Sequence, residues 1–98
     1  MKNQNQMIFG VAWFKPEQWQ ALRNASVDRK KMEETHSEWL LNANRALKEL
    51  RAQGMTVEPV EIDVKELVAW CQEQGLPLNS SARSRYAAEK IREKYGTA

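Results

Sequence analysis

The apolar stretch from Met7 to Phe14, MIFGVAWF, constrains the fold of this chain more than any other feature. In an extended strand its alternate residues form a bulky face and a slender face, and both are apolar: Met7, Phe9, Val11 and Trp13 on one, Ile8, Gly10, Ala12 and Phe14 on the other. Two apolar faces are typical of a strand that is covered on both sides. Gly10 and Ala12 leave room for another element to approach closely. We therefore expect a strand over residues 7–14 that helices cover fully, or that a second copy of the chain extends into a larger sheet.

Two helices are expected after this strand. Lys15-Pro16-Glu17 ends the strand and favours a short helix over residues 16–24. Asp28 is a suitable N-cap for a long amphipathic helix over residues 29–53, which Gly54 ends. At 1.5 Å per residue that helix would be about 37 Å long, so in a chain of this size it should bend or project. Weak helix formers in its middle favour a bend there: Thr35, Ser37, Asn42 and Asn44.

A second strand and two more helices complete the pattern. Residues 55–62 are expected to form a strand, and Pro59 makes it an edge strand or introduces a bulge. Helices are expected over residues 64–74, and from Asn79 or Ser80 to about residue 95. The chain should therefore be a mostly helical α+β protein of order β-α-α-β-α-α. Because each short connection should reverse the chain direction, we expect a small two-stranded antiparallel sheet, with extension by dimerisation as one alternative.

Length and composition favour one globular domain over residues 7–96, preceded by a flexible N-terminus at residues 1–6. The chain has 98 residues, of which 42% are apolar and 29% charged, as in ordinary globular proteins. Its apolar runs are far shorter than the ~20 residues that cross a bilayer, so no membrane partner is expected. A single cysteine, Cys71, cannot form a disulfide within the chain, which is consistent with a cytoplasmic protein.

Charge is unevenly distributed, although the net charge is only +2. Residues 1–31 and 80–98 are net basic, and residues 32–79 are net acidic. These blocks can neutralise one another within a chain or between subunits, which is the interpretation we favour. The alternative is a modest basic face for an anionic partner.

Few residues could carry chemistry. His36 is the single histidine, and both it and Cys71 fall on apolar helix faces, where a place in or beside the core is the usual role. A thiol site that combines Cys71 with His36 is the enzymatic alternative. One cysteine and one histidine cannot supply a zinc site, and the isolated glycines do not form a phosphate loop. We therefore predict no catalytic residues, no metal and no cofactor.

The last two predicted helices, within residues 64–95, have the outline of a helix-turn-helix. Four residues at the start of the second helix could contact an anion or nucleic acid: Ser80, Ser81, Arg83 and Arg85. Any antiparallel helix pair with a capped second member has this outline, and the net charge is low for a DNA-binding domain. Plain helix packing is the first interpretation, and nucleic-acid binding is the alternative.

Tryptophan is abundant, with four residues in the chain. Trp13 and Trp19 lie on either side of the corner at Pro16, where they should face a shared core or a subunit boundary. The candidate interface residues are Phe9, Val11, Trp13, Trp19, Trp39 and Trp70. The sequence thus predicts a small, non-catalytic protein-interaction module whose partner is a second copy of itself or another protein.

Overall fold

Two strands lie at the centre of the fold. The computed structural model describes residues 7–96, and the terminus expected to be flexible lies outside them. Strand β1 (Ile8–Trp13) pairs in parallel with β2 (Thr56–Glu61), in a continuous register from Ile8 opposite Thr56 to Trp13 opposite Glu61. The antiparallel sheet expected from the sequence is therefore wrong, although the α+β class and the β-α-α-β-α-α order of the main elements are confirmed. Pro59 causes no bulge in this register.

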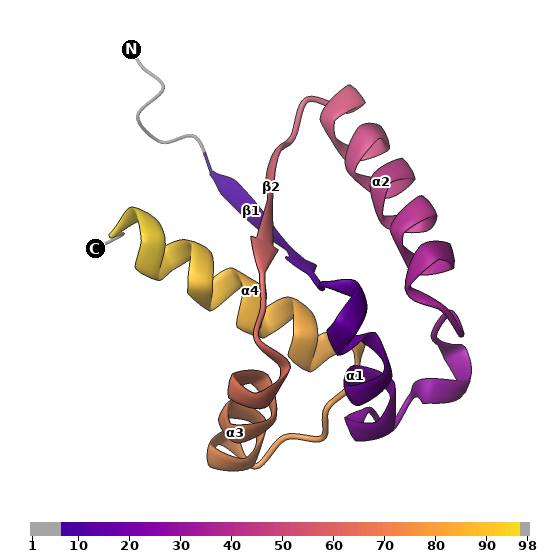
Figure 1. Ribbon diagram of the computed structural model, residues 1–98. Helices are drawn as coiled ribbons and strands as arrows, with labels where there is room; N and C mark the ends of the chain where they lie inside the picture. The colour runs from indigo at the N-terminus through magenta and orange to yellow at the C-terminus, as the bar shows by residue number, and fades with distance from the viewer. Residues whose placement is uncertain (1–6, 97–98) are drawn as a thin grey trace.

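The parallel direction follows from how the first connection is built. The 3₁₀ helix η1 (Pro16–Gln18) and helix α1 (Trp19–Ala25) lie at the carboxyl end of β1. At about 10 Å, α1 is only half as long as a six-residue strand of about 20 Å, so it forms part of the turn and does not run back along the sheet. Only α2 (His36–Ala52) runs back, and β2 therefore starts at the same end as β1 (Figure 1).

The long helix expected over residues 29–53 is divided in two. A short 3₁₀ helix, η2 (Arg29–Lys31), precedes an extended Met32, and α2 begins only at His36. Thr35 caps α2: its hydroxyl accepts from the Glu38 N–H at 3.2 Å, and the Glu38 carboxylate accepts from the Thr35 N–H at 3.3 Å. Asp28 makes no side-chain cap.

Helices cover both faces of the sheet. In Figure 1 the strands lie between α2 and α4 (Ser80–Tyr95), and α3 (Val64–Gln74) lies beside the start of α4. The bounds expected for these last two helices are confirmed. Helix α4 packs against Gly10 so closely that a Cβ atom there would lie 2.5 Å from Ile91 Cγ1 and 2.8 Å from the Ala87 carbonyl oxygen. The close approach expected at this glycine is thus present.

The main core lies at the carboxyl end of the sheet, between α1, α3 and α4. Its buried members are Phe14, Trp19, Leu22, Ile62, Val64, Leu67, Trp70, Cys71, Leu78, Ala82, Tyr86 and Ala87. Within residues 7–96, no helix is both long and apolar enough to cross a membrane.

Candidate interaction surfaces

The outer edge of β2 is closed. Ile62 N–H donates to the Trp13 carbonyl at 3.0 Å, so the backbone groups of Val57 and Pro59, on the alternate residues, point away from β1. Arg51 Nη2 donates to the Val57 carbonyl at 3.1 Å. Pro59 has no N–H to offer. A further strand therefore cannot pair regularly with this side of the sheet.

The outer edge of β1 is open by comparison. The same alternation directs the N–H and C=O groups of Gly10 and Ala12 away from β2. In the described part of the chain these groups have no hydrogen-bond partner. Apolar side chains border them, since Met7 is 67% exposed and Phe9 is 43% exposed, while Val11 is half-buried. We call these backbone groups and the side chains of Met7, Phe9 and Val11 the β1 edge.

Most of the tryptophans face their own chain. Trp13, Trp19 and Phe14 all surround Trp39, with ring centroids 5.1, 5.4 and 5.7 Å from its ring. Trp19 is buried here, and Trp70 is buried elsewhere, against Tyr86. Of the six candidate interface residues, Phe9, Val11 and the half-buried Trp13 lie on β1. Trp19 and Trp70 belong to the core, and the half-buried Trp39 on α2 packs against it.

His36 belongs to the same aromatic cluster. Its Nε2 lies 2.7 Å from the Phe14 carbonyl oxygen, which can only accept, so this nitrogen carries the proton. Cys71 is buried on α3, and burial raises the pKa of its thiol although the charge of Arg83 partly offsets this. No hydrogen bond joins Cys71 to His36 within residues 7–96, and no group of three or more acidic, histidine or cysteine side chains there could hold a metal ion.

The start of α4, where the sequence suggested an anion site, contacts a carboxylate of the chain itself. Arg83 binds Asp28 through two hydrogen bonds of 3.1 and 2.8 Å. The Ser80 N–H donates to the same carboxylate at 3.1 Å, and Arg83 also donates to the Ser26 hydroxyl at 3.1 Å. The hydrogen bond from Arg83 lowers the pKa of Asp28 against the opposing effect of burial. Two of the four candidate anion-binding residues are therefore occupied internally.

The other two candidate residues are exposed. The Arg85 guanidinium lies 5.9 Å from the centre of the Trp70 ring, and Ser81 is open to solvent. The structure thus brings Ser80 and Arg83 together around Asp28 and turns Arg85 toward α3.

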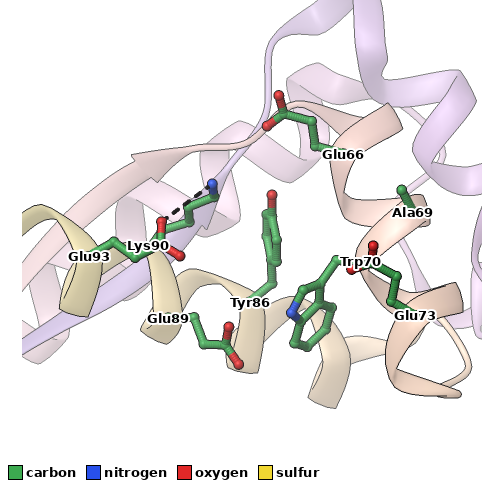
Figure 2. Close-up of a pocket in the computed structure, with 8 residues that line it drawn as sticks. All are labelled: Glu66, Ala69, Trp70, Glu73, Tyr86, Glu89, Lys90 and Glu93. Atoms are coloured by element: carbon green, nitrogen blue, oxygen red, sulfur yellow. Dashed lines mark ion pairs between the residues drawn. The ribbon is translucent and has the colours of Figure 1, made fainter.

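A groove that the sequence did not suggest lies between α3 and α4 (Figure 2). It has a volume of about 370 Å³, and its lining residues are Glu66, Ala69, Trp70, Glu73, Tyr86, Glu89, Lys90 and Glu93. We call it the α3–α4 groove. The signal in the sequence is helical spacing: residues 66 and 73 are two turns apart on α3, and residues 86, 89, 90 and 93 share one face of α4.

Among residues 7–96, Lys90 is the one lysine that lines the groove. It pairs with Glu93 at 3.7 Å and lies 5.2 Å from the centre of the Tyr86 ring. Burial lowers the pKa of Lys90, but Tyr86, Glu93 and Glu66 together raise it by more, so the pKa lies above the ordinary value for lysine. The amine therefore stays charged and neutralises only part of the groove.

The groove continues to the carboxyl ends of the strands. A second hollow of about 280 Å³ shares Glu66 and Lys90 with it, and is otherwise lined by Lys15, Gln18, Glu61, Ile62 and Asp63. In α/β sheets the carboxyl ends of parallel strands are a common position for ligands. Here Lys15 and Glu61 pair with each other at 3.7 Å.

The chain belongs to a family described as a domain of unknown function, DUF8829, whose model matches residues 2–96. No curated protein and no solved structure gives a match. Function is therefore inferred from the chain's own surfaces.

Proposed function

We propose that this member of the DUF8829 family is a non-catalytic interaction module that forms a homodimer through the β1 edge. The observation that carries the proposal is the difference between the two sides of the sheet. Arg51 and Pro59 close the β2 side, whereas Gly10 and Ala12 leave backbone groups unpaired on the β1 side of the described structure. An unpaired edge beside exposed apolar side chains is a template for another strand.

A second copy of the chain suits this edge because the edge is complementary to itself. Two chains related by a twofold axis present their β1 strands to each other in opposite directions, which joins the two sheets into one of four strands. With the axis close to Val11, Gly10 of each copy exchanges hydrogen bonds with Ala12 of the other. Phe9 then lies opposite Trp13 of the second copy, and such aromatic cross-strand pairs are favourable.

Charge also permits two copies to meet here. Residues 7–14 carry no ionisable side chain, so the twofold arrangement does not place like charges together along the strand. A two-stranded sheet is marginal on its own, and a four-stranded sheet with helices on both faces is the more usual architecture. The pairing would also remove Phe9 from water.

The test is the mass in solution of the wild type and two variants. Phe9→Lys places a charge on the β1 edge, and Val27→Lys places the same charge at another exposed apolar residue, in the loop before η2. By light scattering and sedimentation equilibrium, we expect the wild type and Val27→Lys to be dimers and Phe9→Lys to be a monomer. A wild type that stays monomeric at every concentration, or a Phe9→Lys protein that dimerises equally well, would refute the proposal.

We also place the protein in the cytoplasm, which the single free Cys71 supports, since secreted proteins of this size commonly depend on disulfides. Fractionation of the source cells tests this, and recovery from an oxidising compartment would contradict it.

A further inference from the structure

The α3–α4 groove is lined by more carboxylates than Lys90, the lysine in its lining, can neutralise. Four glutamates line it, and Glu93 is the one that pairs with Lys90. Within residues 7–96 the carboxylates of Glu66, Glu73 and Glu89 form no ion pair. Figure 2 shows glutamates on both walls of the groove, with Glu66 and Glu73 on α3 and Glu89 and Glu93 on α4. The groove therefore attracts cations.

A hydrogen-bond donor without a partner in the described structure adds a second requirement. Trp70 is only 9% exposed, yet its indole N–H has no acceptor among the described residues. The contrast is Trp19, whose indole N–H donates to the Glu33 carbonyl at 3.3 Å. Figure 2 shows the Trp70 nitrogen turned into the groove, on the side of Glu89. The indole can only donate, and this nitrogen is not fully buried, so water can accept from it in the free protein. A ligand that displaces this water must bring an acceptor oxygen of its own, because a donor left unpaired under the ligand would be unfavourable.

These two requirements select the chemistry of the ligand. Arginine and lysine side chains satisfy the carboxylates, and a backbone carbonyl of the same peptide satisfies Trp70. A protonated polyamine brings cations without an acceptor. A metal ion is disfavoured as well, because no group of three or more potential ligands converges within residues 7–96. We propose that the α3–α4 groove binds an arginine- or lysine-rich segment of a partner protein.

The groove has room for such a segment. From Tyr86 to Glu93 it follows about two turns of α4, or about 10 Å, and it then meets the hollow with Glu61 and Asp63 at the end of the sheet. An extended peptide advances about 3.3 Å per residue, so three or four residues cover the first part. Basic residues beyond these would reach the hollow.

The experiment follows the indole N–H signal of Trp70 by NMR, assigned with Trp70→Phe, during titration at low salt. The probe is a short capped peptide of alternating arginine and alanine, and the matched peptide has glutamate in place of arginine. We expect the basic peptide to shift the Trp70 signal to saturation and the acidic peptide to leave it unchanged. Absence of a shift with the basic peptide would overturn the proposal.

Charge variants show whether the groove is the binding site. The double variant Glu73→Gln/Glu89→Gln removes two carboxylates from it, and Glu17→Gln/Glu34→Gln removes two exposed carboxylates elsewhere. We expect the first pair to weaken binding about tenfold or more, and the second to have little effect. Equal weakening by both pairs would mean that net charge alone attracts the peptide, and the proposal would be abandoned.

Spermine and calcium chloride, titrated in the same way, test the other kinds of cation. Each should bind at least about tenfold more weakly than the peptide, because neither offers an acceptor to Trp70. Equal affinity for either one would contradict a peptide site.

Discussion

Replacing Gly10 with alanine tests the contact between β1 and α4. The new Cβ atom would lie 2.5 Å from Ile91 Cγ1, 2.8 Å from the Ala87 carbonyl oxygen and 3.0 Å from Val60 Cγ2. These separations are all shorter than the 3.5–4.0 Å at which carbon atoms attract each other, so the helix or the strand must move. Overpacking of this kind costs about 1–3 kcal/mol. For a domain of this length each kcal/mol lowers Tm by about 4–8 °C.

A double-mutant cycle identifies the contact responsible. Ile91→Ala alone leaves a cavity and should cost about 2–5 kcal/mol. The double variant Gly10→Ala/Ile91→Ala lacks the nearest clash. Its loss of stability should therefore be smaller than the sum of the losses in the two single variants, by about 1 kcal/mol or more. The rescue stays partial because the Ala87 carbonyl is backbone and cannot be removed.

Gly54→Ala is the control, since Gly54 has φ +90° and nothing within 4 Å of a Cβ atom. Gly54→Ala should lower the stability because alanine disfavours the left-handed backbone at this position. In the double variant Gly54→Ala/Ile91→Ala, the two losses of stability should simply add. Urea unfolding at one protein concentration measures all five variants and the wild type, because the proposed dimerisation would make stability depend on concentration. A Gly10→Ala protein as stable as the wild type, or additive losses in the cycle, would show that α4 does not press on Gly10.

Three further predictions concern ionisable groups. Arg83→Ala should lower the free energy of unfolding by about 1–3 kcal/mol, because it leaves the half-buried Asp28 carboxylate without its cationic partner. Lys94→Ala should lower it by less, because the ion pair of Lys94 with Glu58 is at the surface. Because folding lowers the pKa of Asp28, ionised Asp28 contributes to the free energy of unfolding above about pH 4, and this contribution is lost as the pH falls further. In urea titrations at a series of pH values, Asp28→Asn should therefore make the stability decrease less steeply in acid. Equal losses from the two alanine variants would contradict this. Cys71 should react with iodoacetamide only on unfolding, because burial raises the pKa of its thiol, and fast labelling of the native protein would restore the thiol-site alternative.

The elements that local signals define are the ones that the sequence predicts well. Asp63 and Gly75 delimit α3, and Asn79 and Gly96 delimit α4, because caps and left-handed glycines act within one turn. The start of α2 is missed although its signal is present. Thr35 and Glu38 form a capping box in the sequence itself, whereas Asp28, which we expected to cap this helix, makes no side-chain cap.

Strand direction could not be read in the same way, because it depends on the length of α1 compared with the sheet. The candidate surfaces depend even more on contacts between residues that are far apart in the sequence. Asp28 and Arg83 are 55 residues apart, so no local pattern shows that one neutralises the other. The glutamates of the α3–α4 groove have helical spacing within each helix, but only the packing of the two helices makes their faces converge. The unpaired edge of β1 appears only once β2 lies on its other side.

The closure of β2 by Arg51 and Pro59 determines how large an assembly this chain can build. A sheet with two open edges would accept copies on both sides and grow without limit, as fibrils do. Here the two copies that meet at β1 would each turn a β2 strand outward, and those strands lack a free N–H at Pro59 and a free carbonyl at Val57. In the proposed dimer, growth by strand addition would therefore stop at two chains, and a very apolar strand could lie at a contact surface without seeding aggregation.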